Sequence, residues 1–387
     1  EDGTYSAFDV LQSAVPEHPT LRPHRLAVGL YSATAAGLVR THRVELDVDG
    51  ERTAVDELVG RPAADLVLVN DDDLTYCKLR LDPRSLATLT ERIGEFTDSL
   101  PRALCWTASW DMTRDGELAA RDYVRLVLSG IDAEDDIGVV QTLLRQLQAA
   151  LANYVDPAHA EQGWVALADK AWDALHAVEP GGDHQLAWSR AFAAAARTEK
   201  HAMQLRGLLD GSVAVDGLAV DTDTRWIFLH SLVAMGGAGQ DEIAAELERD
   251  TTATGARHAA TATALIPDAD AKAESWRRAI EDDSLPNAMN RAITVGFAHP
   301  AQTTLLRPYV ARYFEVISDV WERRSSEIAQ QVVVGLFPSV VEQETVDATD
   351  AWLAADEHPP ALQRLVVEGR DGIARALRCR AVDVAGV

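Results

Sequence analysis

The chain is short of basic residues and has no long apolar run. Its 387 residues include 36 lysines and arginines against 61 aspartates and glutamates, so the formal net charge is −25 at pH 7. A surface this negative repels phosphate backbones and anionic lipid, so we expect neither nucleic acid nor a membrane as partner. The longest apolar stretch, residues 332–341, contains Gly335 and Pro338 and is far shorter than the roughly 18 residues of a membrane-spanning helix.

Cysteine is also scarce. Cys77, Cys105 and Cys379 are odd in number and far apart, which fits neither a disulfide framework nor a zinc knuckle. This usage favours a reducing, cytoplasmic location. The sequence has no initiator methionine and no signal-peptide pattern at its start, so we expect a fragment of a longer protein.

Residues 1–82 have the pattern of a β domain. The runs 24–31, 39–48, 66–69 and 75–81 are short and rich in apolar residues, and several alternate apolar with polar side chains. An Asp-Gly pair at Asp49 and Gly50 is typical of a tight hairpin turn. We therefore predict a small antiparallel β-sandwich over this region.

Residues 83–387 have the pattern of a helical domain. Asp82-Pro83 and Asp156-Pro157 each combine a favoured N-cap residue with proline at the first helical position. Many short helices joined by tight connections follow, and they favour stacked helical hairpins. The prediction is a mainly α protein with a HEAT/armadillo-like α-solenoid, and a globular helix bundle is the competing architecture.

No catalytic or metal-binding set is found in the sequence. None of the 11 histidines is followed by glutamate, and no two of them have the i, i+4 spacing of a zinc-peptidase helix. The nucleophile elbow, the phosphate loop and the dinucleotide fingerprint are missing as well. Asp71-Asp72-Asp73 lacks the spacing of a calcium loop, so we interpret it as a solvated β-turn.

Four stretches, in order along the chain, resemble the C-terminal region of aminopeptidase N enzymes of the actinobacterial type. The first is LVLVNDDDLTYCKLRLD at residues 66–82, where an apolar strand ends in Asn70 and a second run ends in Asp82. The others are WTASWDMTRDGELAARDYVRLVLSGI at 106–131, residues 274–297, and WERRSSEIAQQVVVGLFP at 321–338. The chain is thus identified as similar to the β-sandwich and helical terminal domains of that zinc metallo-aminopeptidase family.

The resemblance implies that this chain is one part of a longer enzyme and that another part carries out catalysis. The Gly-x-Met-Glu-Asn and His-Glu-x-x-His motifs of the family lie in a catalytic domain, and neither occurs here. We therefore expect no cofactor in this chain, zinc in the missing catalytic domain, and that domain and peptide substrates as partners. The helical domain is expected to enclose the active-site cavity and to gate peptide access.

For substrate binding we predict Arg291, beside Asn287, as a receptor for a peptide carboxylate, while a salt bridge of Arg291 to Glu281 or Asp283 is the competing interpretation. Two other functions stay open at this point. One is a stand-alone α-solenoid scaffold that binds a partner protein. The other is an unrelated enzyme whose site is assembled from scattered acidic residues.

Overall fold

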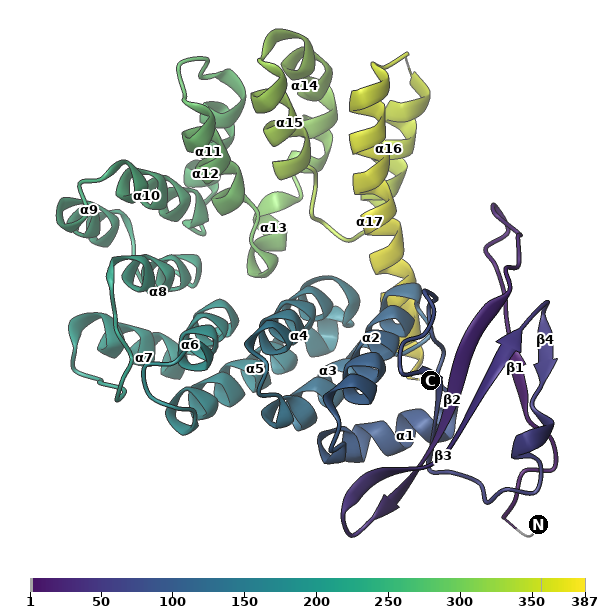
Figure 1. Ribbon diagram of the computed structural model, residues 1–387. Helices are drawn as coiled ribbons and strands as arrows, with labels where there is room; N and C mark the ends of the chain where they lie inside the picture. Colours follow the sequence, from purple (N-terminus) through teal and green to yellow (C-terminus); the bar gives the residue numbers. More distant parts are fainter. Residues whose placement is uncertain (1–2, 356, 387) are drawn as a thin grey trace. The chain divides into compact units, whose positions relative to one another are not determined.

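A computed structural model describes residues 3–355 and 357–386 (Figure 1). The chain packs as two compact units. The first contains the residues up to Ala150 together with the last residues from Val382, and the second runs from Leu151 to Ala381. A domain boundary at Asp82 stays a prediction.

Five strands form two small antiparallel sheets in the first unit. They are β1 (Asp9–Leu11), β2 (His24–Thr34), β3 (Gly37–Val48), β4 (Arg52–Ala54) and β5 (Leu66–Asp71). One sheet has the order β3-β2-β5 and the other pairs β1 with β4. Val10 of β1 packs in the same apolar cluster as Val28 of β2 and Val44 of β3, so the two sheets share a core.

Residues 75–81, predicted as a strand, form none. Lys78 and Arg80 reach instead to Asp115, with Nζ and Nη2 at 2.7 and 2.6 Å from Oδ2 of Asp115. The turn before this segment is confirmed, because the Asp73 N–H donates to the Asn70 carbonyl at 3.0 Å. The prediction that it is solvated is wrong for Asp71, which is fully buried.

The carboxylates of this turn are bound by strand residues. Asp71 accepts hydrogen bonds from the Tyr31 hydroxyl and from Arg40, both at 2.8 Å. Asp72 pairs with Arg40 and with Arg43, at 2.7 and 2.6 Å. These oxygens therefore anchor the end of β5 to β2 and β3.

Helices make up most of the remaining chain, so the prediction of a mainly α protein with a small β part is confirmed. In the first unit they are α1 (Pro83–Arg92), α2 (Ser99–Asp115), α3 (Ala120–Gly130) and α4 (Ile137–Ala149). Asp82 caps α1, because its carboxylate accepts from the N–H groups of Arg84 and Ser85. The last residues also belong to this unit, and there Asp383 accepts from the Arg121 N–H at 2.6 Å.

Helices make up the second unit, and the last of them continues past Ala381 into the residues assigned to the first unit. They are α5 (Pro157–Ala177), α6 (Asp183–Ala195), α7 (Glu199–Asp210), α8 (Thr222–Ala234), α9 (Gln240–Arg249), α10 (Ala253–Leu265), α11 (Ala269–Glu281), α12 (Asn287–Phe297), α13 (Thr303–Leu306), α14 (Tyr309–Arg323), α15 (Ser326–Gly335), α16 (Gln343–Ala355) and α17 (Pro360–Ala385). Asp156 caps α5 by accepting from the Ala158 N–H, as its pairing with Pro157 predicts. None of the helices in the described ranges is long and apolar enough to cross a membrane.

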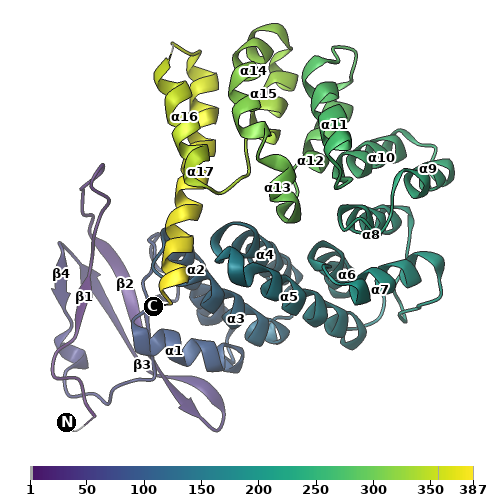
Figure 2. The ribbon, with the colours of Figure 1, turned by 180° about the vertical axis from the view of Figure 1, so that it is seen from behind.

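Helices of the second unit contact one another in chain order. Contacts run from α6 to α8, from α8 to α10, from α10 to α12 and from α12 to α15, and α10 and α12 lie side by side in both views (Figures 1 and 2). α10 and α12 approach closely at Gly296, where a Cβ atom would lie 2.2 Å from the Thr261 carbonyl oxygen. The buried side chains form several clusters along the chain, a pattern that favours a stacked array. The HEAT/armadillo assignment stays a prediction.

Candidate functional site

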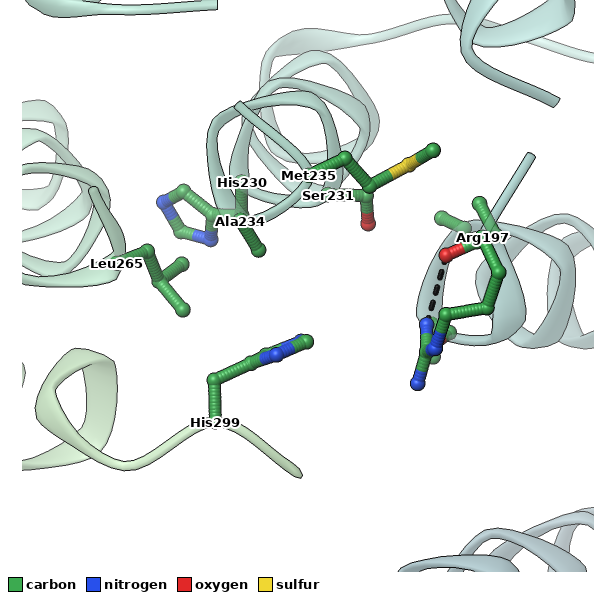
Figure 3. A pocket seen from close by; sticks show the side chains of 10 residues that line it. Arg197, His230, Ser231, Ala234, Met235, Leu265 and His299 are labelled. Carbon is green, nitrogen blue, oxygen red and sulfur yellow. Dashed lines mark hydrogen bonds between the residues drawn. The ribbon is translucent and has the colours of Figure 1, made fainter. Parts of the chain in front are cut away.

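A pocket of about 140 Å³ lies among the helices of the second unit. It is bounded by the C-terminal ends of α6, α8 and α10 and by the segment after α12 (Figure 3). Small and apolar residues make most of its wall, and the polar groups are Arg197, His230, Ser231 and His299. The other lining residues are Ala193, Ala194, Ala196, Ala234, Met235 and Leu265.

Arg197 follows the end of α6 and is held by backbone groups. Its Nη1 donates to the carbonyls of Ala194 and Ala196, at 3.1 and 2.7 Å, and its guanidinium carbon lies 4.2 Å from the Trp164 ring centroid. Its Nε atom is buried without a hydrogen-bond partner, and no carboxylate of the described residues forms an ion pair with it. Burial lowers the pKa of Arg197 to about 10, although the charge of Glu161 acts in the opposite direction. The side chain therefore stays cationic at neutral pH.

His299 presents a neutral imidazole to the same pocket. Its Nδ1 accepts a hydrogen bond from the Ala301 N–H at 3.3 Å, where His299 caps the short 3-10 helix Pro300–Gln302. Burial lowers the pKa of His299 to about 4, and the nearby charges of Arg197 and Lys272 lower it further in the same direction. Because Nδ1 is the acceptor, the proton of the neutral ring is on Nε2.

His230 is also neutral. Its Nε2 lies 2.9 Å from the His258 carbonyl oxygen and must be the donor, because a carbonyl only accepts. Burial lowers the pKa of His230 to about 4, and the neighbouring His258 also lowers it, while the hydrogen bond raises it. Neither pocket histidine therefore carries charge at pH 7.

Lys272 adds a buried positive charge near the pocket, where Arg197 is only half-buried. Its side chain is fully buried, and Nζ donates to the carbonyls of Ala264 and Phe297, at 2.6 and 2.8 Å. These carbonyls lie in the last turns of α10 and α12, where helix dipoles favour a cation. Burial lowers the pKa of Lys272 to about 8, so it stays mostly protonated at pH 7.

The predicted substrate residues lie elsewhere. Asn287 is half-buried at the start of α12 and Arg291 is exposed one turn later, and neither lines this pocket. Asp283, proposed as a salt-bridge partner of Arg291, pairs instead with Arg323 and Arg324 at 2.9 and 2.6 Å. A role of Arg291 and Asn287 in binding stays a prediction.

Sequence reasoning missed Arg197 and His299. The one local signal is the run Ala193-Ala194-Ala195-Ala196 before Arg197, because small side chains at a helix end leave space beside a long one. Within residues 3–355 and 357–386, no group of three or more His, Cys, Asp or Glu side chains is placed to bind a metal ion.

Comparison with known proteins identifies the class. Residues 66–375 match the model of the ERAP1-like C-terminal domain, and the chain belongs to that family. It is 54% identical over 392 aligned residues to a protein named Aminopeptidase N from Streptomyces lividans. The alignment covers 99% of this chain and 46% of the relative, so the chain spans about half the length of the protein it matches. The resemblance to the C-terminal region of aminopeptidase N is thereby confirmed.

Proposed function

We propose that this chain is the non-catalytic C-terminal portion of a zinc-dependent aminopeptidase N, an enzyme that removes N-terminal residues from peptides. The observation that carries the proposal is the match of nearly the whole chain to about half of a protein named Aminopeptidase N. On this proposal the partners are the enzyme's own catalytic domain and peptide substrates, and the location is cytoplasmic, in keeping with three free cysteines.

Zinc belongs to the catalytic domain in this proposal. The side chains present here do not fit a catalytic zinc, because the sequence lacks the His-Glu-x-x-His motif and the described residues offer no three-ligand group. We therefore assign no step of peptide hydrolysis to this chain.

The role we propose for the chain is to enclose the active-site cavity and to gate peptide access. Enclosure admits short or flexible peptides and excludes bulk water from the reacting groups. Opening and closing of such a cover can also limit product release. The net charge of −25 supports attraction of the cationic N-terminus of a peptide.

The chain alone is expected to be inactive on alanine p-nitroanilide, with or without added zinc, because its sequence lacks the His-Glu-x-x-His motif and its described residues offer no three-ligand group. The assay measures p-nitroaniline release across the fractions of a size-exclusion column. The intact enzyme, assayed in parallel, is the positive control. Chelator-sensitive hydrolysis that co-elutes with the isolated chain would contradict the assignment of this chain as non-catalytic.

A further inference from the structure

The residues that end β5 and follow it form a turn with an uncommon backbone. Asn70, Asp72 and Asp73 have φ angles of 57, 68 and 54°, in the left-handed region that residues other than glycine adopt at a cost. Such conformations persist where the surrounding structure fixes them, and they are concentrated at functional sites. The turn therefore has a fixed shape, which positions the residues after it.

Buried side chains hold the segment that follows this turn. Asn70 is 1% exposed, and its side-chain amide donates to the Thr75 carbonyl at 2.8 Å while its side-chain oxygen accepts from the Thr75 N–H at 3.0 Å. His24 Nδ1 lies 2.7 Å from the Thr75 hydroxyl oxygen. A few residues further along, Leu79 is buried. The segment is therefore anchored at both ends.

Between these anchors the segment exposes apolar side chains. Tyr76 is fully exposed, Leu74 is 44% exposed, and Cys77 is exposed as well. We call these three residues the Tyr76 surface. The backbone N–H groups of Tyr76 and Cys77 donate to no acceptor among the described residues. Tyrosine is enriched at the centre of protein interfaces, and its hydroxyl takes a hydrogen-bond partner when it is buried. A matching partner therefore offers an apolar hollow with acceptor groups.

The charged residues that follow the Tyr76 surface in the chain are paired. Lys78 and Arg80 both bind Asp115, and Arg80 also pairs with Glu117. A partner that covers the surface leaves neither cation without a counter-charge, so the desolvation cost stays low. An aromatic centre with a polar rim is the usual anatomy of a protein interface.

The comparison with known proteins favours one occupant of this surface. The aligned relative has more than half of its length outside the part that matches this chain. Residues 66–375 match a C-terminal domain, so most of that length precedes the matching part. Two domains of one chain typically bury about 600–1,500 Å² between them, which requires complementary exposed surface on both. The Tyr76 surface lies in the first unit, which also contains the first described residues, to which a preceding half would be joined.

We propose that the Tyr76 surface is a docking site for the catalytic half of the intact enzyme, with the Tyr76 ring in an apolar hollow and its hydroxyl on a polar group of that half. This inference rests on the proposed function, because it takes the preceding half to be the catalytic one. The fixed turn has a role in this docking, since a segment that is already ordered loses little entropy on binding.

Hydroxyl-radical footprinting, read by mass spectrometry, compares the isolated chain with the intact enzyme. We expect the oxidation rate of Tyr76 to be at least about fivefold lower in the intact enzyme, because residues at the core of an interface are fully buried. Tyr123, which is fully buried in this chain, is the internal control and should be oxidised slowly in both samples. Equal oxidation rates of Tyr76 in the two samples would overturn the proposal, and this test needs no variant to fold.

A charge at the same position provides a second test. Tyr76→Asp is expected to leave the melting temperature of the isolated chain unchanged, because the side chain is exposed there, and to lower that of the intact enzyme by at least about 3 °C. Val15→Asp replaces another exposed apolar side chain of the first unit, so it is the matched control and should change neither. A loss of equal size in both proteins, or in neither, contradicts docking through Tyr76.

Two further measurements separate the alternatives. A dimer of the isolated chain in sedimentation velocity that Tyr76→Asp dissociates would assign the surface to a second copy and overturn the proposal. Hydrolysis of alanine p-nitroanilide by the intact protein tests the proposed function independently. Protection of Tyr76 in an intact protein without this activity contradicts the proposed function but supports docking of the preceding half, whereas full activity with an unprotected Tyr76 contradicts the docking site alone.

Discussion

Replacing Glu134 by alanine is expected to lower the free energy of unfolding of the first unit by about 3–5 kcal/mol. Glu134 and Arg102 form a bidentate pair with N–O distances of 2.6 and 3.2 Å, and their side chains are only 4% and 8% exposed. Glu134 also accepts from the Trp106 indole N–H at 2.6 Å. The alanine variant leaves the Arg102 charge buried with only the Phe96 carbonyl, at 2.9 Å, to satisfy it.

The measurement is urea unfolding of the purified chain, followed by circular dichroism. Glu95→Ala is the control, because Glu95 pairs with Arg92 at 3.0 Å on an exposed surface, where such a pair contributes less than about 1 kcal/mol. The double variant Arg102→Met/Glu134→Leu is expected to be more stable than Glu134→Ala, since it removes both buried charges. Equal losses for Glu134→Ala and Glu95→Ala would contradict this account of the pair.

Acid is expected to destabilise the second unit through His230 and His299. Each has a folded pKa of about 4 against roughly 6.5 in the unfolded chain. Between these pH values the unfolded chain binds more protons than the folded chain. The stability that the neutral, buried imidazoles contribute is therefore fully present above pH 6.5 and is lost as the pH falls toward 4. At pH 5 each histidine should lower the free energy of unfolding by about 2 kcal/mol relative to neutral pH, and the two together by about 4 kcal/mol.

Two substitutions isolate this effect. His230→Gln keeps a donor for the His258 carbonyl, and His299→Asn keeps an acceptor for the Ala301 N–H. We expect the difference in unfolding free energy between pH 7.5 and pH 5, measured by urea titration, to shrink by about 2 kcal/mol in each variant. His18→Gln, at an exposed position, is the control and should leave the difference unchanged. An unchanged difference in the pocket variants would show that these histidines do not titrate as their burial predicts.

Local chemistry made some features predictable from the sequence. Asp82 and Asp156 cap α1 and α5 as expected, because an N-cap depends on a side chain and the backbone two or three residues later. The segment at 75–81 was mispredicted because its alternation suits a strand, while Lys78 and Arg80 bind Asp115 of α2, more than 30 residues away. A sequence pattern contains no information about such a partner.

The pocket could not be predicted from the sequence for the same reason. Arg197 lines the pocket together with residues of α8, α10 and the segment after α12, and this depends on residues as far away along the chain as His299. Arg291 is an example of a partner expected from closeness in sequence that the fold does not supply. Asp283, its suggested partner, is bound instead by Arg323 and Arg324, about 40 residues further along the chain. Residue type identified the arginines, and tertiary packing decided which one lines a pocket.

The most direct test of the proposed gating role compares the intact enzyme with a version that ends before this helical region. The measurement is the ratio of kcat/KM for a short peptide to that for a folded protein with the same N-terminal residue. A cover over the active site predicts a high ratio for the intact enzyme and a ratio at least about tenfold lower without the helices, because a folded protein then reaches the catalytic site. The same ratio in both forms, with the short-peptide activity intact, would contradict the account.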